Sequence, residues 1–199
     1  MSGQKNRAVN VAIFASGAGS NAQKIIDVFR NDDLIKIKLI ISNNAEAGVL
    51  SIAANEKIPS LLIKKKRFYE EDAYLPELKE QQIDFIVLAG FLLKVPSILI
   101  NRYPNKIVNI HPALLPKYGG KGMYGSKVHE AVIAAKEKES GISIHYVDEI
   151  YDHGNIIFQA RCTVDENENP ATLAQKIHLL EHKHYPEVIA RLLKATNNS

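Results

Sequence analysis

The chain has 199 residues, a formal net charge of +3 and 46% hydrophobic residues, which is the balance of a globular protein with a substantial core. This length predicts one domain over residues 1–199. Binding to nucleic acid or to an anionic membrane requires a surface on which positive charge predominates. The small net charge excludes such a surface, so we expect neither partner. A single cysteine, Cys162, excludes an internal disulfide and favours the cytoplasm. The sequence has no run of 18 apolar residues, so no transmembrane helix is expected.

The first half of the chain alternates strand and helix patterns. Apolar runs predict strands at 9–15, 37–41, 61–63, 85–89 and 107–110, and helical spacing predicts helices at 20–30, 45–55 and 69–82. The run at 85–89 is the most apolar, so we expect it at the centre of the sheet. The alternation predicts an α/β fold, with an open, mostly parallel, Rossmann-like sheet and helices on both faces.

The pattern changes after Pro112. A glycine-rich stretch at 119–122 leads into a helix at 126–136, and two strands at 142–147 and 155–164 lie close enough in sequence to form an antiparallel pair. A helix at about 171–193 follows. We therefore divide the domain into an N-terminal half over about 8–105 and a C-terminal half over about 106–195, the latter adding antiparallel strands to the sheet.

The loop Ser16-Gly17-Ala18-Gly19-Ser20-Asn21 joins the first strand to the first helix. Glycines let the backbone approach a ligand closely, and the free N–H groups of a helix start attract phosphate. A plain strand-to-helix turn is the alternative. The loop also fits the dinucleotide pattern G-x-G-x-x-A, but the second strand is followed by no carboxylate until Glu46. A monophosphate is the favoured ligand.

Two polar residues, Asn109 and His111, end the fifth predicted strand. Residues two apart in a strand point to the same face, and ligands bind at the carboxyl ends of strands in open α/β sheets. The alternative is a core histidine beside a capping asparagine. Asp152 lies in the turn between the last two strands, where an acidic residue most often bonds its own backbone.

Together these segments resemble the folate-dependent formyltransferase family. The resemblance covers nearly the whole chain and is carried by the 16–21 loop, the run at 109–116, Asp152 with Gly154, the run at 88–91, and residues 181–186. The phosphate loop is similar to that of the family members that formylate glycinamide ribonucleotide (GAR), the phosphoribosylglycinamide formyltransferases. Relatives that act on methionyl-tRNA or hydrolyse formyl-folate carry a further domain, for which 199 residues leave no room.

The resemblance implies roles for individual residues. Asn109, His111 and Asp152 would be catalytic, and Gly19, Ser20 and Asn21 would bind the phosphate of GAR, with Glu181 nearby. The folate site would comprise Arg67, Leu92, Leu93, Val95, Asn109, Asp148 and Asp152. The chain departs from the family at Leu93, where arginine is common, at His153, where glycine is usual, and in the stretch 119–125, and these departures bear on the folate contacts.

The implied reaction transfers the formyl group of 10-formyltetrahydrofolate to the amine of GAR in purine biosynthesis, without a covalent intermediate. The folate would be a cosubstrate, with no tightly bound cofactor and no metal. Asp152 beside His111 is expected to raise the histidine pKa from about 6.5. Two alternatives stay open, a 10-formyltetrahydrofolate hydrolase and a non-catalytic nucleotide-binding module. We expect a monomer or homodimer.

Overall fold

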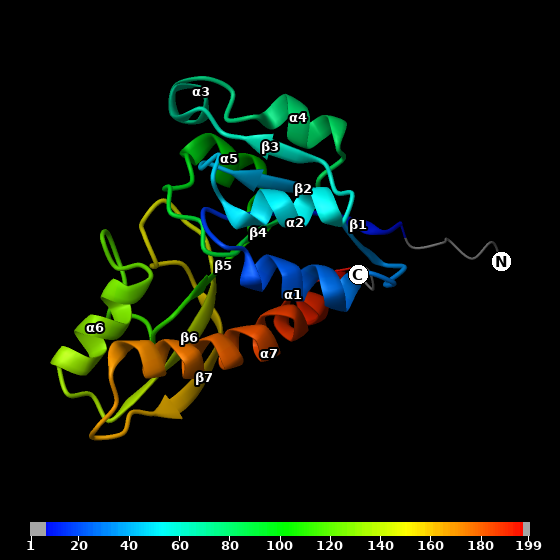
Figure 1. Ribbon diagram of the computed structural model, residues 1–199. Helices are drawn as coiled ribbons and strands as arrows, with labels where there is room; N and C mark the ends of the chain where they lie inside the picture. The colour runs from blue at the N-terminus through cyan, green and yellow to red at the C-terminus, as the bar shows by residue number, and fades with distance from the viewer. Residues whose placement is uncertain (1–6, 197–199) are drawn as a thin grey trace.

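The computed structural model describes residues 7–196, in which seven strands form one sheet (Figure 1). The strands are β1 (Val9–Phe14), β2 (Ile35–Ser42), β3 (Ser60–Leu62), β4 (Phe85–Leu88), β5 (Ile107–His111), β6 (Glu139–Tyr146) and β7 (Ile156–Thr163). Their spatial order is β3-β2-β1-β4-β5-β6-β7. The first five pair in parallel, and β6 and β7 add antiparallel strands. The predicted fold class is confirmed.

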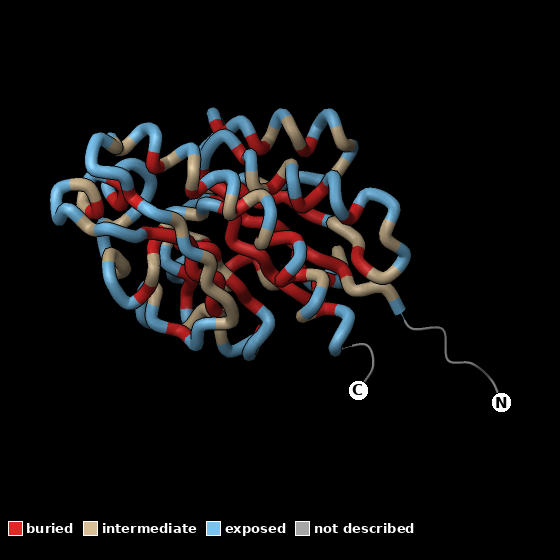
Figure 2. Tube along the Cα trace, turned by 90° about the horizontal axis from the view of Figure 1, so that it is seen from below, coloured by how far each residue is buried: buried red, intermediate tan, exposed pale blue. Residues whose placement is uncertain are grey.

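The central strand is β4, as its sequence predicts, and all four of its residues are buried. A strand covered on both faces cannot carry polar residues on either one, which is why Phe-Ile-Val-Leu occupies this place. Figure 2 shows the buried residues concentrated in the strands, with the exposed residues in the surrounding loops and outer helix faces.

Helices cover both faces of the sheet. They are α1 (Ser20–Phe29), α2 (Gly48–Asn55), α3 (Lys65–Glu70), α4 (Leu75–Glu80), α5 (Ser97–Arg102), α6 (Ser126–Ala134) and α7 (Pro170–Thr196). Alternate residues of β1 enter two separate cores: Val11 and Ile13 pack with α1, α2, α6 and α7, whereas Ala12 and Phe14 pack with α3, α4 and α5. Figure 1 shows α1 and α7 side by side, and the two helices are in contact.

The single helix predicted at 69–82 is wrong. The chain forms two short helices, α3 and α4, separated by Ala73 and Tyr74 in the left-handed region at φ 48° and 62°. Pro76 lies in the first turn of α4, where a missing N–H costs no helical hydrogen bond. The apolar periodicity continues across the break because both helices cover the same face of the sheet, and it therefore conceals the interruption.

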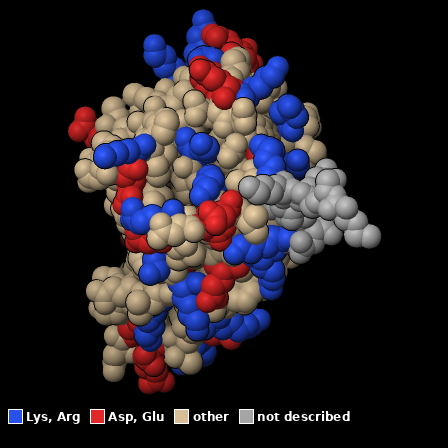
Figure 3. Space-filling view, turned by 90° about the vertical axis from the view of Figure 1, so that its right-hand side faces the viewer, with Lys and Arg blue, Asp and Glu red and all other residues tan. Residues whose placement is uncertain are grey.

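The molecular surface carries charges of both signs. Figure 3 shows Lys and Arg interspersed with Asp and Glu on the face viewed from the right of Figure 1. Within residues 7–196, no helix has the length and apolar character needed to cross a membrane.

Candidate active site

A cavity of about 1020 Å³ opens at the carboxyl ends of the parallel strands. The strand order reverses between β1 and β4, so the chain leaves these neighbours in opposite directions and the loops that follow them separate. Those loops line the cavity together with the end of β5, the turn between β6 and β7, and residues of α6 and α7. Of the site residues predicted from the sequence, all but Arg67 line this cavity.

The loop after β1 presents an uncapped helix start to the cavity. Helix α1 begins at Ser20 after Gly19, which has φ 84°, and no side chain caps its free N–H groups. Gly17, Ala18 and Ser20 are exposed, and each of them lines the cavity. Backbone N–H groups at a helix N-terminus form an anion site because the helix dipole adds partial positive charge there. This geometry fits the predicted phosphate site.

Gly19→Ala is expected to destabilise the protein by about 2 kcal/mol, because a side chain at a left-handed position is strained. A Cβ atom on residue 19 would also lie 2.8 Å from Val49 Cβ and 2.9 Å from Val49 Cα. Thermal unfolding should show a fall in Tm of roughly 4–8 °C. Gly17→Ala is the matched control, because a Cβ atom there meets no atom within 4 Å. Equal Tm values for the two variants would contradict the strain and crowding assigned to a side chain at residue 19.

Helix α7 carries a buried carboxylate to the same end of the cavity. Glu181 is 6% exposed, and its Oε2 accepts hydrogen bonds from Asn21 Nδ2 at 3.0 Å and from His178 Nδ1 at 3.2 Å. The hydrogen bond to Glu181 raises the pKa of His178. Tyr185 fixes the helix against the sheet, since its buried hydroxyl donates towards the carbonyls of Leu88 and Val108. A carboxylate held in this way is suited to a ribose hydroxyl next to the phosphate loop.

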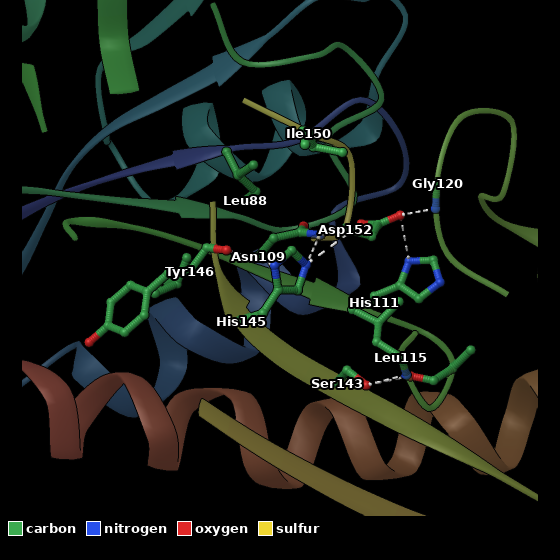
Figure 4. A network of polar contacts seen from close by, with 12 residues as sticks. Leu88, Asn109, His111, Leu115, Gly120, Ser143, His145, Tyr146, Ile150 and Asp152 are labelled. Carbon is green, nitrogen blue, oxygen red and sulfur yellow. Dashed lines mark hydrogen bonds and ion pairs between the residues drawn. The ribbon is translucent and has the colours of Figure 1, made fainter. Parts of the chain in front are cut away.

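Asn109, His111 and Asp152 converge, as predicted (Figure 4). The first two project from β5, and Asp152 reaches them from the turn after β6. The Nδ1 atom of His111 lies 3.5 Å from Asp152 Oδ2, and the Nδ2 atom of Asn109 lies 3.4 Å from Asp152 Oδ1. The carboxylate therefore contacts both other members of the set.

The hydrogen bonds of His111 determine which ring nitrogen can titrate. Its Nε2 lies 2.7 Å from the carbonyl oxygen of Tyr118. A carbonyl only accepts hydrogen bonds, so Nε2 carries a proton in both charge states of the ring. In the neutral ring the free lone pair is consequently on Nδ1, the atom that faces Asp152.

The expectation of a raised His111 pKa is wrong. Burial of the imidazole, which is only 3% exposed, is the largest influence and lowers its pKa below 6.5, although Asp152 and the Tyr118 carbonyl act in the opposite direction. Distance explains the outcome, because the 3.5 Å contact with Asp152 is too long for a strong ionic hydrogen bond. The free protein thus holds His111 neutral near pH 7.

Asp152 is held in its ionised form. Burial raises the pKa of the carboxyl, but the neighbouring imidazoles of His145 and His111, which attract the carboxylate when they are protonated, and a hydrogen bond from Gly120 N–H at 2.9 Å together lower it below its usual value. Its backbone is left-handed at φ 54°, which turns the side chain out of the turn and into the cavity. Asp152 does not bond its own neighbouring backbone in the manner usual for acidic turn residues.

One residue of this network, His145, is not predicted by the sequence motifs. It is 2% exposed on β6 and pairs directly with Asn109 across the antiparallel ladder. Its Nδ1–H donates to the Tyr146 carbonyl at 2.8 Å, which leaves Nε2 to accept from Asn109 Nδ2 at 3.0 Å. His145 thereby orients the Asn109 amide. Strand pairing is the sequence feature that could have identified His145, because a strand β6 paired with β5 places His145 opposite Asn109.

The predicted folate residues divide into two groups. Leu92, Leu93, Val95 and Asp148 line the cavity between the loop after β4 and the turn after β6. Arg67 does not reach it, because Asp72 and Glu77 bind its guanidinium and Tyr74 stacks on it at 4.2 Å. The cations Lys94 and Lys121 do line the cavity. His153, a departure from the family, donates to Asp148 Oδ2 at 2.8 Å on the exposed side of the turn.

The same arrangement of segments occurs in a known family. A family model described as "Formyl transferase" matches residues 9–189. The chain belongs to the formyl transferase family. This match covers the phosphate loop, the Asn109–His111 strand end and the Asp152 turn alike.

Several similar proteins of this family share one name. The chain is 36% identical to the phosphoribosylglycinamide formyltransferase of Bacillus subtilis, over 94% of this chain and 95% of that one. It is 38% identical to the chloroplastic enzymes of Arabidopsis thaliana and Vigna unguiculata, covering 68% and 61% of their lengths. The solved phosphoribosylglycinamide formyltransferase of Bacillus halodurans superposes with a TM-score of 0.83 at 37% identity, over 92% of this chain and 95% of that one.

Among residues 7–196, no three His, Cys, Asp or Glu side chains form a group suited to a metal ion.

Proposed function

We propose that this chain transfers the formyl group of 10-formyltetrahydrofolate to the amine of GAR, giving formyl-GAR and tetrahydrofolate. The observation that carries the proposal is one cavity lined both by an uncapped helix start and by the Asn109–His111–Asp152 set. A phosphate held at the helix start leaves the ribose beside Glu181 and directs the amine towards His111. The apolar wall of Leu92, Leu93 and Val95 suits the pterin of the folate.

Proton transfer is assigned to His111. The GAR amine nitrogen attacks the formyl carbon, a C–N bond forms, and the carbonyl electrons move to oxygen to give a tetrahedral oxyanion. Neutral Nδ1 of His111 takes the proton that the amine loses and passes it to N10 of the folate as the C–N10 bond breaks. Asp152 stabilises the imidazolium that exists between these two transfers.

Charge stabilisation is assigned to the Asn109 amide, aided by the positive charge of the His111 imidazolium. One Asn109 N–H is occupied by His145 at 3.0 Å, whereas the contact of Nδ2 with Asp152 is long at 3.4 Å. The long contact is the weaker one, so a formyl oxygen can displace it. A donor already oriented by His145 stabilises the developing oxyanion without reorganisation during the reaction.

The first expected result is a His111 pKa below 6.5 in the free protein, because burial disfavours the charged ring. A lowered pKa means that the basic form persists as the pH falls through 6.5 and is lost only at lower pH. Titration of the His111 ring by NMR, assigned with the His111→Asn variant, measures this value. A His111 midpoint above 6.5 would contradict the proton route through neutral Nδ1.

The assay that tests the function measures consumption of 10-formyltetrahydrofolate with and without GAR. We expect consumption only when GAR is present. Consumption without GAR would show the hydrolase instead, and no consumption in either case would show a nucleotide-binding module. The phosphate site favours the transferase over the hydrolase, since a hydrolase needs no ribonucleotide, and the His111–Asp152 contact favours an enzyme over a binder.

We further propose that the folate is a dissociable cosubstrate. Each turnover converts it to tetrahydrofolate, which must leave before the next formyl donor binds. We assign the activity to the cytoplasm, whose reducing conditions agree with the free thiol of Cys162.

A further inference from the structure

One short segment of backbone holds both His111 and Asp152. We define the strap as residues 116–120, which follow β5 and reach the cavity at Gly120. The Tyr118 carbonyl accepts from His111 Nε2 at 2.7 Å, and the Gly120 N–H donates to Asp152 Oδ2 at 2.9 Å. Both groups belong to the backbone, so the position of the strap sets the orientation of the imidazole and of the carboxylate together.

The backbone of the strap has little conformational freedom at Tyr118 and Gly119. Tyr118 is left-handed at φ 58°, a conformation that a tyrosine adopts only where its surroundings impose it. Gly119 is tightly enclosed, because a Cβ atom on it would lie 2.5 Å from Leu115 Cδ2 and 3.2 Å from Asp152 Cβ. The conformation therefore depends on contacts outside the strap.

The outer contact is made by Glu137, which follows α6. Its Oε1 accepts from the Tyr118 hydroxyl at 2.9 Å and from Lys117 Nζ at 2.8 Å. The Tyr118 ring, which lies between its backbone carbonyl and its hydroxyl, packs against the core that contains Val11 and Ile13. Glu137 does not line the cavity, so it contacts neither substrate nor reacting atoms. Its carboxylate and the core together hold the side chain of Tyr118, and a residue fixed through its side chain cannot rotate its carbonyl freely.

We propose that Glu137 is a positioning residue for His111, acting through Tyr118. With the strap held, the Tyr118 carbonyl keeps the proton of neutral His111 on Nε2 and leaves Nδ1 free as the base. Without the tie to Glu137, the strained Tyr118 backbone relaxes, the carbonyl turns away, and the proton redistributes between the two ring nitrogens. A proton on Nδ1 blocks that atom as a base. The inference rests on the proposed function for its kinetic consequence, and on geometry alone for the tautomer.

The experiment compares Glu137→Ala and Tyr118→Phe with the matched control Glu139→Ala. Glu139 is two residues further on, is exposed, and pairs with Arg161 away from the strap. The ¹⁵N shifts of the His111 ring, recorded above its pKa, report the tautomer. We expect wild type and Glu139→Ala to show the Nε2–H form, and Glu137→Ala and Tyr118→Phe to show a mixture of both tautomers.

The kinetic readout is kcat at saturating substrates. Loss of one orienting hydrogen bond should lower kcat about tenfold in Glu137→Ala and in Tyr118→Phe, with KM for GAR unchanged. Glu137→Gln, which retains an oxygen acceptor for the Tyr118 hydroxyl, should recover most of this loss. An unchanged Nε2–H tautomer in folded Glu137→Ala and Tyr118→Phe overturns the proposal. Since the NMR measurement requires no turnover, an inactive wild type would refute the proposed function and leave the tautomer test decisive.

Discussion

His111→Asn is expected to lower kcat by roughly 10²–10⁴-fold, the range that loss of a general acid–base group produces. The proposed proton route passes through His111 Nδ1 twice, from the amine and then to N10, so its removal affects both steps. Asparagine is too short to replace Nε2 as the donor to the Tyr118 carbonyl, but the Tyr118 hydroxyl still donates to Glu137, so the strap should keep its place. KM for GAR should change little, because Gly19, Ser20, Asn21 and Glu181, the residues assigned to its phosphate and ribose, are unchanged.

The control for this variant is His184→Asn. His184 lies on α7 beside Phe158 and Glu187 and does not line the cavity. Its substitution therefore measures how much kcat changes when a histidine outside the cavity is lost. Matching circular dichroism spectra and Tm values would establish that both variants are folded. A kcat for folded His111→Asn within a few-fold of wild type would remove His111 from the mechanism.

Asp152→Asn is expected to lower kcat by about 10²–10³-fold, the magnitude seen when a charged or polar group that stabilises a transition state is removed. The amide oxygen of asparagine can still accept from Gly120 N–H, so the turn should be preserved. Without the negative charge, the imidazolium that forms during the reaction loses its counter-ion. Because Asp152 raises the His111 pKa, its removal should lower that pKa further, and the His111 midpoint measured by NMR should move to lower pH.

Asp165→Asn provides the comparison. Asp165 follows β7 and binds Lys176 on the surface at 2.7 Å, away from the cavity, and its substitution should leave kcat unchanged. An unchanged or raised His111 pKa in Asp152→Asn would contradict the assigned electrostatic role. It would indicate that the carboxylate acts on the substrate instead of on the histidine.

The sheet can be predicted from the sequence because its strands are buried on both faces and read as continuous apolar runs. The central place of β4 follows directly from Phe-Ile-Val-Leu. The region at 69–82 cannot be predicted correctly in the same way. Its periodicity reflects burial against one face of the sheet, whereas the break at Ala73 and Tyr74 depends on left-handed backbone that no apolar pattern records.

The candidate site, too, can be predicted only in part from the sequence. Convergence of Asn109 and His111 follows from strand periodicity, whereas their approach to Asp152 is implied only by family resemblance. The direction of the His111 pKa shift depends on burial and on a 3.5 Å separation, neither of which a sequence contains. Resemblance places Arg67 in the folate site, but its guanidinium is paired with Asp72 and Glu77 and does not reach the cavity.

Transfer of a formyl group from folate to the GAR amine in this cavity can be followed directly. The most direct measurement follows a ¹³C-labelled formyl group by NMR during incubation of 10-formyltetrahydrofolate and GAR with the protein. We expect the label to appear as the formamide of formyl-GAR, in equal amount to the tetrahydrofolate produced, and His111→Asn to slow its appearance. Label appearing as free formate at the same rate with and without GAR would contradict the proposed transfer.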